Sequence, residues 1–99
     1  MPRKRRLTRT QSSDDARRTV VRIQTGVRME KRLYLVLRAL AATFDLSFGD
    51  LLEGIVLHAF EGRAPFNKSS LKKVDALRKV YGLDLRASDS HRLLEAPTP

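Results

Sequence analysis

The chain has 99 residues and a formal net charge of +9, with 20 Lys and Arg against 11 Asp and Glu. It contains no cysteine, which excludes disulfides and cysteine-based zinc sites, and its apolar stretches are far too short to span a membrane. A chain of this length predicts one small domain with tails, of a kind that often gains stability by dimerising.

The positive charge is concentrated at the N-terminal end. Residues 1–32 hold 11 basic and 3 acidic residues, a net charge of +8, whereas residues 33–99 hold 9 basic and 8 acidic residues, a net charge of +1. This asymmetry predicts a polyanionic partner at the N-terminal end. We favour DNA over membrane headgroups because a basic strand follows directly.

Residues 1–18 are predicted to be a disordered basic tail, because they lack apolar anchors that would offset the entropy of ordering. We expect the tail to add contacts to DNA phosphates. Its basic residues are Arg3, Lys4, Arg5, Arg6, Arg9, Arg17 and Arg18. The tail has no apolar core of the kind that signal peptides carry, so we expect a cytoplasmic protein that associates with the nucleoid.

Residues 20–29 alternate between apolar and polar side chains, which is typical of a strand with one buried face. The inward row is Val21, Ile23, Val27 and Met29. The outward row is Arg22, Gln24, Gly26 and Arg28. No second strand is evident, and a lone strand cannot satisfy its own backbone hydrogen bonds. Its expected partner is therefore the same strand of a second copy.

Two helices are predicted next, over residues 30–44 and 47–60. Apolar side chains recur along both at helical spacing, and Glu30 lies in the first turn of the earlier helix. Ser47 followed by Asp50 has the form of a capping box, and Gly62 ends the second helix. One chain cannot cover all these apolar rows, so we expect folding and dimerisation to be one event. The predicted dimer core is Ile23, Val27, Met29, Leu33, Leu37, Leu52, Ile55 and Val56.

A third helix is predicted over residues 69–81, where apolar residues repeat at helical spacing and Gly82 stops the helix. Ser88 or Asp89 is expected to cap a short fourth turn that carries Leu93 and Leu94. The apolar face of the third helix suits either packing within its own dimer, which we favour, or a separate protein partner.

The order strand, helix, tight turn, helix, from Thr19 to Glu61, resembles the ribbon-helix-helix family of DNA-binding proteins. The resemblance implies a mainly α fold in which two protomers pair their N-terminal strands into an antiparallel ribbon that enters the major groove. The chain then divides into the tail of residues 1–18, a ribbon-helix-helix domain of residues 19–62, and a C-terminal helical extension of residues 63–99.

The resemblance also implies contacts at particular positions. Base contacts fall on the outward row, which is Arg22, Gln24, Gly26 and Arg28. Gly26 departs from the polar residue usual at that position. Phosphate contacts fall on Ser47, Phe48 and Gly49, with Lys31 and Arg32 beside them.

The chemistry of these residues supports the same contacts independently of the family resemblance. Arg28 can donate two hydrogen bonds to guanine, and Gln24 can pair bidentately with adenine. The amides of Phe48 and Gly49 lie at the positive end of a helix, which attracts anions. Asp50 would oppose a nearby phosphate.

An enzyme is not expected, because no Ser-His-Asp spacing and no glycine-rich phosphate loop occurs, and His58 and His91 lack ligand spacing for a metal. No cofactor is predicted. The sequence predicts a homodimeric, sequence-specific transcriptional regulator, a repressor that occludes its operator on double-stranded DNA. The alternatives are an antitoxin-type adaptor whose residues 63–99 bind a protein, a plasmid-partition component, and a nucleoid-coating protein with little sequence preference.

Overall fold

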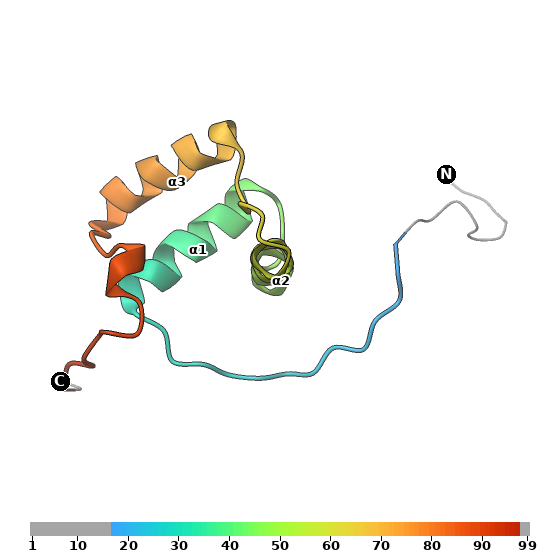
Figure 1. Cartoon of the computed structure of the whole chain (residues 1–99), viewed down its shortest axis with the longest axis horizontal. Helices are drawn as coiled ribbons and strands as arrows, with labels where there is room; N and C mark the ends of the chain where they lie inside the picture. Colours follow the sequence, from blue (N-terminus) through green and yellow to red (C-terminus); the bar gives the residue numbers. More distant parts are fainter. Residues whose placement is uncertain (1–16, 98–99) are drawn as a thin grey trace, which may run out of the picture.

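The computed structural model describes residues 17–97, and this part of the chain is mainly helical, as predicted. Three α-helices follow one another, α1 (Lys31–Thr43), α2 (Phe48–Phe60) and α3 (Lys68–Tyr81), and a short 3-10 helix, η1 (Ala87–Asp89), comes last. Residues 17–29, called here the N-terminal segment, run as an extended strand-like path away from α1 (Figure 1). No β-ladder is present among residues 17–97 of this single chain.

The first helix begins next to a side chain that accepts a hydrogen bond from one of its free amides. Glu30 is the N-cap rather than a first-turn residue, and its Oε1 accepts a hydrogen bond from the Leu33 amide at 2.9 Å. This bond satisfies one of the amides that a helix start leaves without an intrahelical partner. The helix ends at Thr43, and Asp45 in the following turn adopts a positive φ of 56°.

The second helix begins at the residue that its sequence predicts. Ser47 is the N-cap, and its Oγ accepts a hydrogen bond from the Asp50 amide at 3.1 Å. At the other end, Gly62 adopts the left-handed conformation with φ 69°, and the Arg63 amide donates to the His58 carbonyl at 2.9 Å. Glycine carries no penalty in this conformation, which explains why the helix stops there.

The third helix is one residue longer than predicted at its start. Asn67 caps it through a bond from the Ser70 amide, and Gly82 ends it with φ 64°. The prediction of a fourth turn carrying Leu93 and Leu94 is wrong. The turn instead lies at Ala87–Asp89, because the Asp89 carboxylate accepts from the Arg86 amide and closes it there. Both leucines lie beyond it and are exposed.

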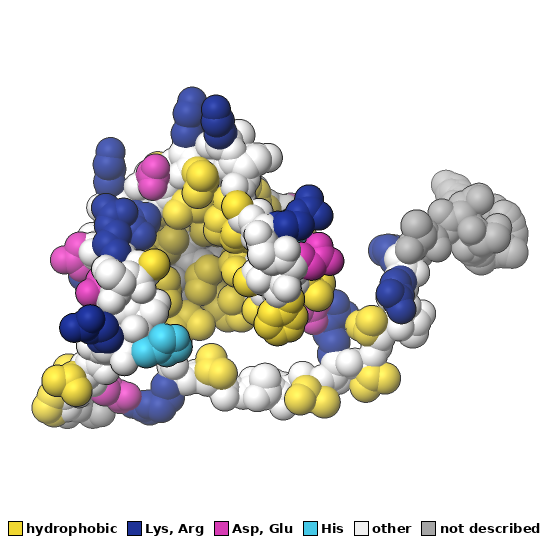
Figure 2. Space-filling model, viewed as in Figure 1, with side chains coloured by type: hydrophobic (Ala, Val, Ile, Leu, Met, Phe, Trp, Pro, Cys, Tyr) yellow, Lys and Arg dark blue, Asp and Glu magenta, His cyan; other side chains and the backbone are white. Residues whose placement is uncertain are grey.

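The core is centred on α1. This helix packs against both α2 and α3, whereas the backbones of α2 and α3 stay apart. The buried side chains are Val36, Leu40, Ala41, Leu51 and Leu83. Val74 and Leu77 of α3 pack against this cluster, so the apolar face of α3 serves the core of its own chain. Hydrophobic side chains accordingly line the space between the helices (Figure 2).

Candidate nucleic-acid interface

The N-terminal segment carries every predicted base-contact residue, and all of them are exposed. Arg22, Gln24, Gly26 and Arg28 lie along one extended stretch, and a Cβ built on Gly26 would meet no atom within 4 Å. The inward apolar row is equally uncovered, since Ile23 is 83% exposed and Val27 is 75% exposed. Apolar side chains left this open in one chain are available to a partner surface.

Arg22 joins the N-terminal segment to α2. Its Nε and one terminal nitrogen each donate to the Glu53 carboxylate at 2.8 Å, and the same terminal nitrogen lies 3.4 Å from Oδ1 of Asp50. The hydrogen bond and the charge of Arg22 hold the pKa of Glu53 below its ordinary value, although partial desolvation works the other way. The hydrogen bond from Arg22 to Glu53 likewise raises the pKa of Arg22.

Arg28 and Arg32 are also engaged with acidic residues of the same chain. Arg28 forms a two-bond pair with Glu95 near the C-terminal end. Arg32 donates to Glu30 at 3.1 Å and to Asp84 at 3.0 Å, and it also bonds the carbonyl of Gly82 at 3.0 Å. Arg32, predicted to contact phosphate, therefore fastens the start of α1 to the chain after α3.

The start of α2 holds the residues predicted to bind phosphate. The Ser47 hydroxyl is used as a cap, and the Phe48 ring packs edge-on against Tyr34 with centroids 5.4 Å apart. The guanidinium of Arg38 lies over both rings, 5.7 Å from that of Phe48 and 5.9 Å from that of Tyr34. Arg38 therefore places a positive charge beside this helix start, which the sequence alone did not indicate.

The same region is otherwise acidic. Residues 45–61 contain four acidic residues, Asp45, Asp50, Glu53 and Glu61, and no Lys or Arg. Residues 63–79, in contrast, hold six basic residues and one acidic residue, a net charge of +5. The net charge of residues 33–99 taken as a whole hides this contrast, because the charges of the acidic and basic blocks nearly cancel. A sliding charge count would have found the basic block on α3, which the sequence prediction missed.

The predicted dimer-core residues fall into three groups. Leu37 and Ile55 pack against the buried core of their own chain. Ile23, Val27, Leu33 and Val56 are exposed to solvent in the single chain, whereas Met29 and Leu52 are half-buried. On α2 the exposed group continues with Leu57 and Phe60, which are not among the predicted dimer-core residues. The apolar surface available to a partner therefore runs along the N-terminal segment and one face of α2.

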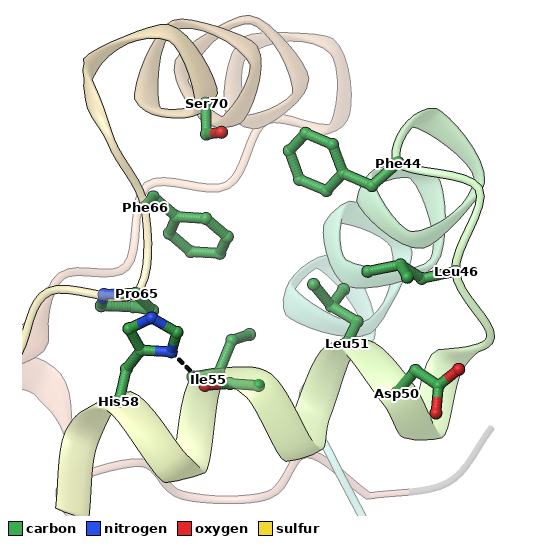
Figure 3. Close-up of a pocket in the computed structure, with 10 residues that line it drawn as sticks. Phe44, Leu46, Asp50, Leu51, Ile55, His58, Pro65, Phe66 and Ser70 are labelled. Atoms are coloured by element: carbon green, nitrogen blue, oxygen red, sulfur yellow. Dashed lines mark hydrogen bonds between the residues drawn. The ribbon is translucent and has the colours of Figure 1, made fainter. Parts of the chain in front are cut away.

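An apolar pocket of about 250 Å³ opens between α2 and the start of α3. In Figure 3, Phe44 and Phe66 face one another across it, and Leu51 and Ile55 project into it from α2. Nδ1 of His58 lies 2.7 Å from the Gly54 carbonyl, a contact within α2 itself. The pocket supplies shape and apolar surface but few polar groups to orient a ligand.

Other kinds of site are not seen in residues 17–97. No three His, Asp or Glu side chains gather there in a way that could hold a metal ion, and none of the helices is long and apolar enough to cross a membrane. Arg17 and Arg18 of the predicted basic tail are exposed. The remaining tail residues, Arg3, Lys4, Arg5, Arg6 and Arg9, lie outside the described residues.

Comparison of the chain with models of protein families, with curated proteins and with solved structures found no match.

Proposed function

We propose that this chain is a homodimeric, sequence-specific DNA-binding regulator that represses transcription by occluding its operator. The observation that carries the proposal is the uncovered apolar row of the N-terminal segment, with Ile23 83% exposed and Val27 75% exposed in the single chain. A basic row alternates with this apolar row along the same backbone. One face of such a segment can therefore bind an apolar partner and the other a negatively charged partner.

The apolar row supports a second copy of the same segment as its partner. The amides and carbonyls of an extended backbone without neighbours can hydrogen-bond only to water. Pairing with a second strand supplies these hydrogen bonds within the protein. Antiparallel pairing of residues 20–29 would bring the apolar rows of two copies to one face, where exposed Val56 and Phe60 of α2 supply further apolar surface. The order of an extended segment, α1, a tight turn and a capped α2 is the order expected of a ribbon-helix-helix protomer.

The opposite face of such a ribbon would present Arg22, Gln24 and Arg28 of both copies. Arg22 and Arg28 already hold planar carboxylates through two parallel bonds each, from Glu53 and Glu95. The same two-bond geometry suits O6 and N7 of guanine in the major groove. On binding DNA, base edges and phosphates would replace these carboxylates.

The experiment that tests the proposal is selection of bound sequences from random duplex DNA with the full-length protein at physiological salt. Arg28→Ala should abolish preference for the selected motif while general affinity falls modestly, because a base contact carries the sequence information and phosphate contacts do not. Arg86→Ala, an exposed arginine outside the N-terminal segment, is the matched control and should keep the preference. If Arg28→Ala keeps the preference for the selected motif, the N-terminal segment does not recognise the bases.

The adaptor alternative has less surface to draw on. Val74 and Leu77 of α3 pack against the core of their own chain, which leaves mainly Leu71 and Val80 of that helix exposed. A protein partner that binds through residues 63–99 could use these two side chains, the exposed Leu93 and Leu94, or the pocket beside Phe66. The regulator proposal accounts for more of the exposed apolar surface.

A further inference from the structure

Three lysines form a row along the outer face of α3. Lys68, Lys72 and Lys79 are spaced four and seven residues apart, so they share one side of the helix. All three are exposed, and within residues 17–97 none of them takes part in an ion pair. Asp75 lies in the same row and offsets one of the charges. Figure 2 shows Lys and Arg side chains projecting from the outer edge of α3.

The row is held rigidly by the rest of α3. Val74 and Leu77 fix the opposite face of the helix in the core, and Leu83 is buried just beyond its end. One terminal nitrogen of Arg78 donates to the Leu85 carbonyl at 3.0 Å, which ties the last turn to the following chain. A surface whose backbone is fixed in this way can present charges at a constant spacing.

Lys68 occupies an electrostatically unfavourable position. It is the first residue of α3, and the first turn of this helix holds no acidic side chain. The start of a helix carries a partial positive charge that repels a cation. An anion bound beside Lys68 would be attracted by both the ammonium group and the helix start, so the position favours occupancy by an anion.

The shape and chemistry of the row favour a phosphate backbone over an acidic protein. From Lys68 to Lys79 the helix rises about 16 Å, and duplex DNA presents about one charge per 1.7 Å of its axis, so roughly ten phosphate charges lie along that length. Protein interfaces centre on aromatic or apolar anchors, and this row has none among its lysines, with the half-exposed Leu71 at its edge. Lysine is a point charge that binds phosphates without demanding one orientation.

The row also lies away from the proposed DNA-reading segment. In Figure 1, α3 and the N-terminal segment are on opposite sides of α1. A duplex whose major groove holds the N-terminal segment would therefore leave the outer face of α3 free for another duplex.

We infer that the outer face of α3, through Lys68, Lys72 and Lys79, binds the phosphate backbone of a second nucleic-acid segment, so that the protein bridges two duplexes. The bridging rests on the proposed function, since the first duplex is the one that the N-terminal segment reads. Binding of phosphates to α3 is independent of it. The α3 contacts read no bases, so the second duplex is held without sequence preference.

Capture of a second duplex tests the inference. A duplex carrying the selected motif is fixed to beads, the full-length protein is added, and a fluorescent duplex of unrelated sequence is then offered at 50 to 200 mM salt. The triple variant K68Q/K72Q/K79Q should capture at least about tenfold less of the fluorescent duplex. Its slope of log affinity against log salt for that step should be shallower by about 2.7 for each α3 face engaged. Binding to the bead duplex should change by no more than about twofold.

The matched control is R63Q/R86Q/R92Q. It removes three positive charges that lie outside α3, and it should keep most of the capture of the second duplex. Equal capture by the wild type and K68Q/K72Q/K79Q would overturn the inference, as would a wild type that captures poly-glutamate but no second duplex. The two proposals fail separately. If the wild type binds the selected motif but never captures a second duplex, only the inference about α3 is wrong. If the wild type binds DNA without sequence preference and K68Q/K72Q/K79Q abolishes this binding, the N-terminal segment does not read sequence. The phosphate-binding surface on α3 is then still supported.

Discussion

Arg22 and Glu53 connect the N-terminal segment to α2 through two hydrogen bonds of 2.8 Å each, across 31 positions of the sequence. Both side chains are about half exposed, so water and salt compete with the pair. The contact occupies an arginine that we expect to face DNA. If Arg22 contacts DNA as proposed, the Glu53 carboxylate competes with the DNA for this side chain.

Replacing Glu53 by Gln should strengthen DNA binding. The change weakens the attachment of Arg22 and removes a negative charge near the start of α2, so the affinity for duplex DNA should rise roughly twofold to fivefold. Fluorescence anisotropy with a labelled duplex measures the effect. Glu61→Gln removes the same charge at the other end of α2, where Glu61 faces Arg63 at 3.6 Å, and should change the affinity less. A weaker complex with Glu53→Gln would contradict the expectation.

The attachment of the N-terminal segment should depend on pH. Because the pKa of Glu53 is lowered in the folded chain from an ordinary value of 4.5, the ion pair with Arg22 is fully formed above about pH 4.5. It is lost as the pH falls through the lowered pKa, because the protonated carboxyl no longer pairs with the guanidinium. NMR of the Arg22 side-chain Nε–H group should follow this transition. The same signal should show no such step in Glu53→Gln.

Truncation in the core should destabilise the chain. Leu40 is 1% exposed and lies at the centre of the cluster that α1 forms with the other helices, so Leu40→Ala should lower the free energy of unfolding by about 2–5 kcal/mol. Urea denaturation followed by circular dichroism gives the value. Leu94→Ala removes the same atoms from a side chain that is 99% exposed, and its denaturation curve should overlay that of the wild type.

A charge on the exposed face of α2 should separate the dimer while leaving the protomer folded. Val56 is 44% exposed in the single chain, so Val56→Asp is tolerated there but would bury a carboxylate in the proposed interface. The dissociation constant of the dimer should rise at least about thirtyfold, equivalent to about 2 kcal/mol. Sedimentation equilibrium measures it, with Leu94→Asp as the control. An unchanged dimer would exclude this face of α2 from the interface.

The helices were predictable because their signals are local. Ser47 and Gly82 act on amides and carbonyls within a few residues of themselves, and both mark the helix ends where the sequence analysis placed them. Glu30 was predicted inside a helix that it in fact caps, since glutamate is not a usual capping residue. The fourth turn was misplaced because the deciding bond, from the Arg86 amide to Asp89, competes with equally plausible caps nearby.

The row of basic side chains on the N-terminal segment and the three-helix order follow from the sequence alone, since alternation, capping and helical spacing are properties of neighbouring residues. Only the tertiary structure decided that α3 packs its Val74 and Leu77 against α1, and that Arg22 and Arg28 meet carboxylates far away along the chain. Contacts of this kind depend on how helices are placed in space, and the charge of a distant partner leaves no local trace in the sequence. The spacing of Lys68, Lys72 and Lys79 is a local property that the sequence already holds, whereas the packing of Val74 and Leu77 into the core decided that this row faces outward.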